Sequence, residues 1–146
     1  MNSLRELLRR WLAGESDPPP VTQLVGIRLV DCADGVARLE LEAGRRHHNP
    51  MGIVHGGIFC DLADAAMGVA MASASQAGET FSTIELHTSF FRPVREARLT
   101  AIGKTVRRGS NTGYLECEIS DEQGRLVAKA SSTCLIQSTL SEGERP

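Results

Sequence analysis

One segment constrains the fold of this chain more than any other: a paired glycine, Gly56-Gly57, that leads into a long apolar run ending near Ser75. The run predicts a helix that is apolar on most of its faces, and such a helix has to be covered on most of them. Most of the remaining chain alternates apolar and polar residues, which is typical of strands. The natural packing is therefore a sheet that curls round this helix.

Two carboxylates, Asp61 and Asp64, lie within the apolar helix. A carboxylate in such surroundings has to be paired, solvated by a cavity or used in chemistry. The two glycines at the helix start leave backbone N–H groups that no side chain covers. Such N–H groups stabilise an oxygen atom that gains negative charge. Exposed donors together with a carboxylate are the components that acyl-transfer chemistry needs.

The segments before this helix predict a further helix and two strands. Ser3 and Glu6 have capping-box spacing, and Leu4 to Leu12 carries apolar residues on one helical face. This N-terminal helix either packs on the domain or binds a membrane surface or partner. Residues 17–20, Asp-Pro-Pro-Pro, predict a stiff connector, and strands are expected over 24–30 and 37–42.

The segments after the central helix carry strand patterns only. Strands are expected at 84–90, 97–106, 115–119 and 126–132, with a turn-rich loop at 107–113. The order of one helix, two strands, a long buried helix and four strands indicates the α+β class. The sequence divides into an N-terminal helix with a Pro-rich connector (1–20), one domain (21–137) and a polar tail (138–146) expected to be mobile.

Composition excludes several kinds of protein. A net charge of −2 and a pI of about 6.1 disfavour nucleic acid as a partner. The four cysteines are far apart, which predicts reduced core residues and no disulfides.

The charged N-terminus is unlike a signal peptide, and the central helix is too rich in Gly, Ala and Asp to span a membrane. We therefore expect a cytoplasmic protein. The four histidines lack metal-ligand spacing, so no metal is expected.

Several of these residues together form a recognisable pattern. Asn49, His55-Gly56-Gly57, Asp64 and Phe90-Phe91-Arg92-Pro93 occur in the right order and spacing over about residues 24–136. The chain thereby resembles the hotdog-fold acyl-CoA thioesterases, in the branch of the phenylacetate-degradation and para-hydroxybenzoyl-CoA enzymes. The resemblance implies a curved antiparallel sheet round one long helix. It also implies hydrolysis of a small acyl- or aryl-CoA thioester to free acid and CoA, with no cofactor.

The resemblance also implies a role for each residue of the pattern. Asp64 is the nucleophile or the general base, and the Gly56 N–H polarises the thioester carbonyl. Asn49 orients the carbonyl or the attacking water, while His55 has a positioning role or, alternatively, transfers a proton. Some relatives carry a hydroxyl one turn after the acid, where this chain has Gly68, and Thr83 is the candidate to supply it instead.

A basic segment is the candidate contact for the phosphates of CoA. Arginine binds phosphate through two parallel hydrogen bonds. The resemblance places CoA contacts at Arg107-Arg108-Gly109-Ser110, with contributions from Arg92 and Gly57. The alternative is that residues 107–110 form a solvated hairpin turn.

The spacing of the two central groups has a geometric consequence. Gly56 and Asp64 are eight residues apart, which is about 12 Å along a helix. One short Asp side chain does not bridge that gap, so we expect two antiparallel helices from two copies to bring Gly56 of one near Asp64 of the other. The chain is therefore expected to be a homodimer, and whether dimers pair into a homotetramer stays open. Asp61 either complements the helix dipole or bonds at the interface.

Two other functions remain alternatives. A hotdog hydratase or dehydratase would act on an enoyl thioester through a His and an acid, and would change the double bond without releasing thiol. A non-catalytic acyl-CoA-binding module would bind without turnover. The acyl group is not determined by the sequence.

Overall fold

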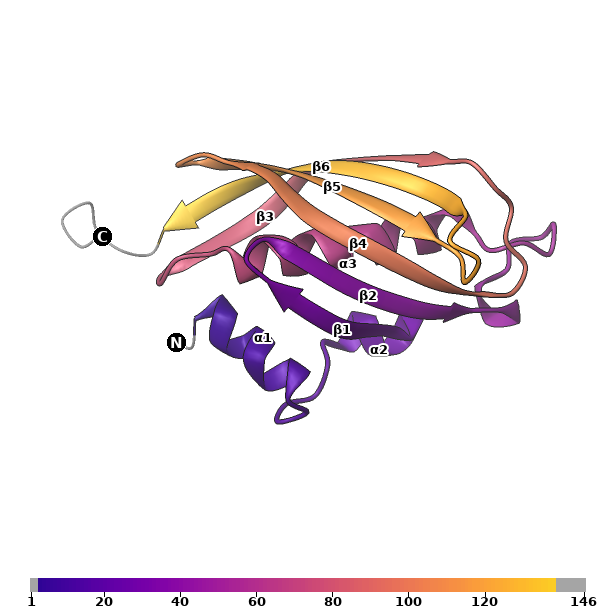
Figure 1. Ribbon diagram of the computed structural model, residues 1–146, viewed down its shortest axis with the longest axis horizontal. Coiled ribbons are helices and arrows are strands. Elements are labelled where there is room, and N and C mark those ends of the chain that lie inside the picture. Colours follow the sequence, from indigo (N-terminus) through magenta and orange to yellow (C-terminus); the bar gives the residue numbers. More distant parts are fainter. Residues whose placement is uncertain (1–2, 139–146) are drawn as a thin grey trace.

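A single long helix, α3 (Gly56–Ser73), lies along the inner side of a six-stranded antiparallel sheet in the computed structural model, which describes residues 3–138 (Figure 1). The strand order is β1-β2-β4-β5-β6-β3. The strands are β1 (Ile27–Ala33), β2 (Val36–Ala43), β3 (Glu79–Phe90), β4 (Ala97–Arg108), β5 (Thr112–Ser120) and β6 (Leu126–Ser138). This arrangement confirms the α+β class and the hotdog fold.

The core lies between α3 and the sheet. Apolar side chains of α3 such as Leu62, Met67 and Met71 are fully buried against inward residues of the strands, including Leu39, Leu99 and Leu115. The closest approach is at Gly103 of β4, where an added Cβ would lie 2.4 Å from the carbonyl oxygen of Ala66. Only a glycine lets the sheet and the helix backbone meet at this distance.

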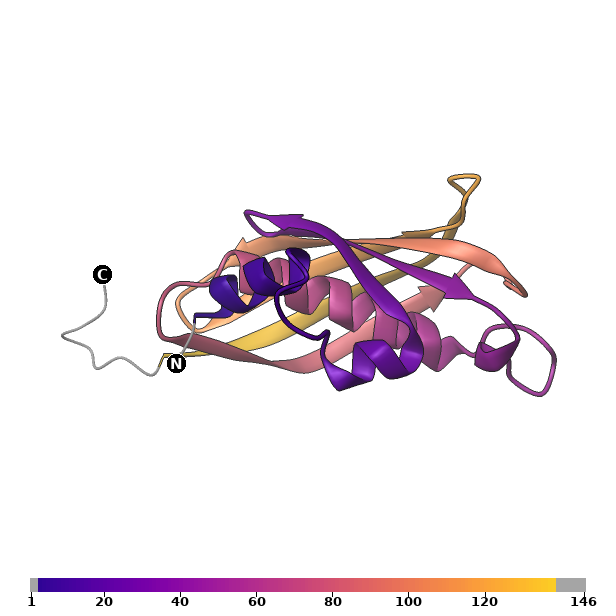
Figure 2. The same ribbon diagram turned by 90° about the horizontal axis from the view of Figure 1, so that it is seen from below.

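Two short helices complete the chain. Helix α1 (Leu4–Leu12) packs against α3 and β1, on the side of α3 that the sheet leaves open, and α2 (Pro20–Val25) contacts β1 (Figure 2). The Ser3 side chain caps α1 by accepting a hydrogen bond from the Glu6 N–H, as the capping-box spacing predicts. A short 3-10 helix, η1 (Arg45–His47), precedes the loop that leads into α3.

Several predicted boundaries are wrong. The strand expected from Leu24 begins at Ile27, because Pro20 starts a helix and Gly26, with φ of +91°, ends it. The strand expected to end at 106 continues to Arg108, so the loop expected at 107–113 is reduced to a tight turn. Apart from Ser138, the polar tail predicted for 138–146 lies outside the described residues.

By length and composition alone α3 could cross a membrane, a test that core helices also pass. It contacts all six strands and α1, which is the packing of a core helix. Strands β1 and β3 are the two edges of the sheet, and β3 pairs only with β6. Unlike every other strand, β3 has no buried residue among its twelve. One flank of α3 and the adjoining edge of the sheet are therefore left open in a single chain.

Candidate active site

The start of α3 presents two uncovered backbone donors. His55 is the N-cap residue, with extended backbone and no side-chain capping bond. The Ile58 N–H is satisfied by the carbonyl oxygen of His55 at 3.0 Å. Within residues 3–138, no acceptor bonds the N–H of Gly56 or Gly57. An oxygen placed here would meet free donors at the positive end of a helix dipole.

The exposed His55 ring lies against Gly57. A Cβ added at Gly57 would be 3.1 Å from Cδ2 of that ring, so a larger residue would push the ring aside. The contact places the imidazole beside the uncovered donors.

Asp64 lies two turns further along α3 and faces β3. The Thr83 hydroxyl of β3 donates a hydrogen bond to Asp64 Oδ1 at 3.0 Å. Thr83 also lies 3.8 Å from Cys134 Sγ on β6, which fixes the side of the strand on which the hydroxyl points. The expectation that Thr83 supplies a hydroxyl near the acid is thus consistent with where the structure places it. Oδ2 of Asp64 has no hydrogen-bond partner within residues 3–138.

Asp61 is the more exposed of the two helix carboxylates. Partial burial raises the pKa of its carboxyl, and the neighbouring negative charge of Asp64 raises it further, against a smaller opposing effect of His55. Asp61 makes no side-chain hydrogen bond among the described residues, unlike Asp64.

Asn49 shapes the loop that leads into α3. Its side-chain oxygen accepts from the N–H of Met51 at 2.9 Å and of Ile53 at 3.4 Å. The loop is fastened to residues 94–95, since the Val54 N–H donates to the Val94 carbonyl at 2.7 Å. The amide nitrogen of Asn49 makes no hydrogen bond within residues 3–138, so it is the donor that Asn49 still has available.

The other histidines are engaged in structural contacts. His47 is buried, accepts from the Gly44 N–H through Nδ1 at 3.1 Å and bonds the Val25 carbonyl through Nε2 at 2.8 Å. His48 bonds the Arg95 carbonyl at 2.8 Å, and His87 lies 2.6 Å from Glu85. Over residues 3–138 there is no cluster of three or more His, Cys, Asp or Glu side chains with the arrangement of a metal site.

The predicted basic segment lies at the opposite end of α3 from Gly56. Arg107 and Arg108 are neighbours in β4, so their side chains point to opposite faces of the sheet. Arg108 forms an ion pair with Glu79. Gly109 closes the turn by donating its N–H to the Thr112 carbonyl at 2.8 Å, and Ser110 is exposed. Of the two arginines, Arg107 is thus the exposed one.

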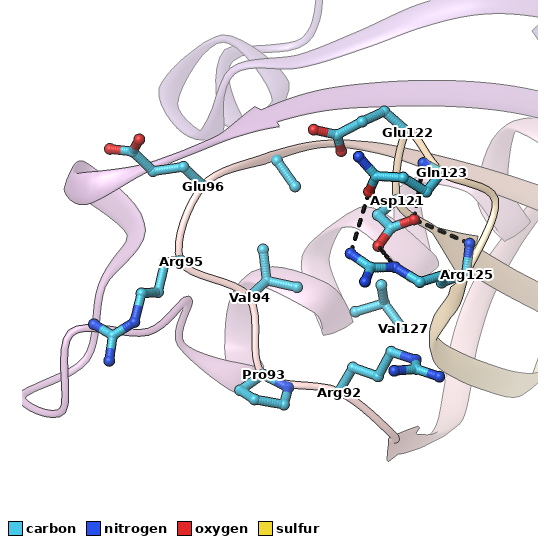
Figure 3. Close-up of a pocket in the computed structure, with 11 residues that line it drawn as sticks. Arg92, Pro93, Val94, Arg95, Glu96, Asp121, Glu122, Gln123, Arg125 and Val127 are labelled. Carbon is cyan, nitrogen blue, oxygen red and sulfur yellow. Dashed lines mark hydrogen bonds and ion pairs between the residues drawn. The ribbon is translucent and has the colours of Figure 1, made fainter.

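Arg92 lies at the same end of the molecule as Gly56. It lines a cavity of about 470 Å³ between the β3–β4 loop and the β5–β6 turn (Figure 3). In this turn the buried Asp121 accepts from Arg125 Nε at 2.7 Å and from the N–H groups of Gln123 and Arg125. Burial alone would raise the pKa of Asp121, but these hydrogen bonds hold it below its usual value.

Sequence reasoning did not single out the residues of this cavity other than Arg92. Residues 121–124 fall between the expected strands 115–119 and 126–132, but their position facing the loop after β3 follows from the sheet order. No local pattern in the sequence reports that order.

Comparison with known proteins agrees with the fold. Residues 51–128, more than half of the chain, match the thioesterase superfamily. A 1,4-dihydroxy-2-naphthoyl-CoA hydrolase of Listeria monocytogenes is 25% identical over 115 residues, which is 79% of this chain and 94% of the hydrolase.

Two solved structures are also similar. A phenylacetic acid degradation-related protein from Ralstonia eutropha has a TM-score of 0.81 and 29% identity, covering 92% of this chain and 99% of its own. A single-residue variant of the phenylacetic acid degradation protein PaaI from Thermus thermophilus has a TM-score of 0.75 and 26% identity. The similarity covers 80% of this chain and 98% of the Thermus chain.

Proposed function

Because the chain belongs to the thioesterase superfamily and is a thioester hydrolase, we propose that it hydrolyses a small acyl- or aryl-CoA thioester with Asp64 and the Gly56 N–H as its central groups. The proposal is based on the location of Asp64 and the Gly56 N–H on the same flank of α3. Both lie on the flank of α3 that borders the open edge strand β3, with the Gly56 N–H uncovered and Asp64 held by Thr83. An electrophile-binding donor and a carboxylate are the two parts that this reaction needs.

The site is composite, with one group from each of two copies. Along α3 the two groups are about 12 Å apart, whereas donor, carbonyl and attacking atom are separated by about 3 Å each. Supporting this, β3 offers an unpaired edge with no buried residue, and its Ile84 is 61% exposed. Open apolar edge strands are suited to pairing with a second copy. The chain is thus a homodimer, and dimers pair into a tetramer or remain separate.

In the proposed reaction the Gly56 N–H binds the thioester carbonyl oxygen and stabilises the negative charge that develops there. The ionised Asp64 of the second copy attacks the carbonyl carbon, giving an anhydride that water then hydrolyses, or it removes a proton from a water that attacks directly. Either way the C–S bond breaks, water supplies the new C–O bond, and the products are a carboxylate and CoA thiol. Thr83 fixes one Asp64 oxygen, so that the other is directed for the reaction.

The remaining residues of the site support this chemistry. The free amide of Asn49 orients the carbonyl or the water, and the Gly57 N–H adds a second donor beside that of Gly56. The His55 ring, lying on Gly57, positions the thioester at the helix start. The substrate supplies CoA, so no separate cofactor is needed. The cysteines at 32, 60, 117 and 134 are free thiols, which fits a cytoplasmic protein.

The phosphates of CoA are bound by arginines at one of two places. Arg92 lies beside the Gly56 end of its own chain, while in the antiparallel pair the turn containing Arg107 of the second copy would also lie towards that end. Gly109 and Ser110 belong to this turn, and Arg108 is held by Glu79.

Single variants distinguish the two places. If Arg92 binds phosphate, Arg92→Gln raises KM for an acyl-CoA about 10-fold, because a hydrogen bond to a charged group is lost. If Arg107 binds phosphate, Arg107→Gln has this effect instead. The same variant leaves KM for the matching acyl-pantetheine, which lacks the nucleotide, unchanged. If neither variant separates the two substrates, the phosphates bind elsewhere.

The function is tested by release of free thiol from a panel of acyl- and aryl-CoA thioesters. We expect turnover by the wild type and a loss of kcat of about 10²-fold or more in Asp64→Asn. Asp61→Asn, three residues away on the same helix, is the matched control and retains most of the activity. Binding without thiol release across the panel would point to a binding module, and a change in an enoyl substrate without thiol release would point to a hydratase.

A further inference from the structure

The aromatic ring of Phe90 lies directly against Gly56. A Cβ added at Gly56 would be 3.1 Å from Cζ of Phe90 and within 3.6 Å of two further ring carbons. Phe90 is the last residue of β3, and its partner in β6 is Ala128, so its side chain lies on the inner side of the sheet with Thr83 and Thr88. The ring therefore borders the helix start on the side that faces β3.

The ring is held in place from behind. It meets Phe59 of α3 edge to face, with ring centres 5.9 Å apart and an interplanar angle of 61°. Phe59 is buried in the core, so it does not yield when Phe90 is pushed inward. The other side of Phe90 is open, since 53% of the residue is exposed. The Phe90 ring is therefore fixed on its inner face and accessible on its outer face.

The Phe90 ring lies within reach of a bound acyl group. A carbonyl oxygen held by the Gly56 N–H lies about 3 Å from the nitrogen, and the carbonyl carbon is one bond further on. The ring carbons of Phe90 are in contact distance of the same glycine. The atoms next to the carbonyl carbon thus pass close to the ring.

We propose that Phe90 determines acyl specificity by excluding thioesters that branch at the carbon next to the carbonyl. An unbranched chain or a flat aryl group lies along the ring, whereas a methyl branch at this carbon needs the space that the ring fills. The ring cannot move toward the core, because Phe59 fills the space on that side. The inference rests on the proposed function, since it takes the Gly56 N–H as the carbonyl donor.

The test compares one unbranched acyl-CoA, the best substrate of the panel, with its 2-methyl analogue. We expect Phe90→Ala to shift the ratio of the two kcat/KM values toward the branched substrate by about 10-fold or more, the range that one methyl group is worth in a fitted pocket. Phe90→Leu, which keeps more of the apolar contact with Phe59, shifts the ratio in the same direction by less.

Phe91 provides the matched control. It is the adjacent residue, has the same side chain and is 54% exposed, but successive side chains of an extended chain point to opposite sides. Phe91→Ala leaves the ratio as in the wild type. An unchanged ratio in both Phe90 variants, or an equal shift in Phe91→Ala, would overturn the proposal while thiol release still upheld the function. Absence of thiol release from every thioester would overturn the proposed function and this inference with it.

Discussion

At the scale of single residues, the contact between Thr83 and Asp64 distinguishes the two carboxylates of α3. The sequence places Asp61 and Asp64 one turn apart. The resemblance favours Asp64, and Asp61 lies nearer the helix start, where the helix dipole by itself favours a carboxylate. The structure adds that Asp64 accepts a hydrogen bond from the Thr83 hydroxyl of β3, whereas Asp61 makes no side-chain hydrogen bond within residues 3–138. In the proposed site Thr83 supplies the hydroxyl that some relatives carry at the position of Gly68.

Removing this hydroxyl should lower catalysis without removing the acid. Thr83→Val is expected to reduce kcat about 10-fold or more, because a hydrogen bond to a charged group is worth about 1.5–3 kcal/mol. Thr83→Ser keeps the hydroxyl and should stay near the wild-type kcat. Thr88→Val is the control, since Thr88 lies on the same side of β3 but contacts Cys60. Equal losses in Thr83→Val and Thr83→Ser would mean that the methyl group, not the hydroxyl, is what matters.

Asp61 should make stability depend on pH. Its pKa is raised above the usual 3.8, so its charged form is less favourable in the folded chain than in the unfolded chain. The destabilisation is absent below that value and grows as the pH rises through the folded pKa. We therefore expect Asp61→Asn to raise Tm over the wild type at pH 7 but not at pH 3. Thermal unfolding of the wild type and of Asp61→Asn at both pH values measures the difference in Tm. The same difference at pH 3 and pH 7 would be inconsistent with the raised pKa of Asp61.

At the scale of elements, the long helix and the alternating strands were predictable because their patterns extend over many residues. The short helix α2 was not, since Pro20 to Val25 has the apolar content of a strand and its identity depends on Pro20 and Gly26 at its two ends. The central helix is rich in Gly and Ala, and small residues allow another backbone to approach closely. The structure adds that one such backbone is β4 of the same chain, at Gly103.

Gly103 should therefore be intolerant of any side chain. In Gly103→Ala the added Cβ would lie 2.4 Å from Ala66 O and 2.8 Å from Met67 N, both backbone atoms that cannot rotate away. We expect a loss of about 3 kcal/mol in unfolding free energy, at the upper end of the cost of overpacking. Gly44→Ala, where nothing lies within 4 Å and the backbone is extended, is the control. Denaturant unfolding measures both, and a Gly103→Ala midpoint equal to that of Gly44→Ala would contradict this packing.

At the scale of the whole molecule, the sequence indicated two copies only through a distance, the separation of Gly56 and Asp64. The open edge at β3 is a property of the sheet order, which no local pattern in the sequence reports. For the same reason, Arg107 and Arg108 looked like one basic turn, although their places in β4 put them on opposite faces. Residue types were readable from the sequence, but the side on which they point needed the fold.

In the proposed dimer each site takes its donor from one copy and its carboxylate from the other. Two inactive variants test it when their subunits are mixed. Asp64→Asn removes the carboxylate, and Gly56→Pro removes the N–H at the first helical position. The backbone there suits proline, because the preceding His55 is already extended, with ψ of 138°. The added Cβ would also press on the Phe90 ring, 3.1 Å away, but this ring borders the donor that the variant has already lost. A mixed dimer then has one site with both defects and one with neither.

The measurement is thiol release by an equimolar mixture of the two variants after subunit exchange. Random exchange makes half of the dimers mixed, and each mixed dimer has one intact site of two, so we expect about one quarter of the wild-type activity. If both groups came from the same chain, no dimer would contain an intact site. Activity no higher than the mean of the two separate variants would mean that the two groups of a site do not come from different copies.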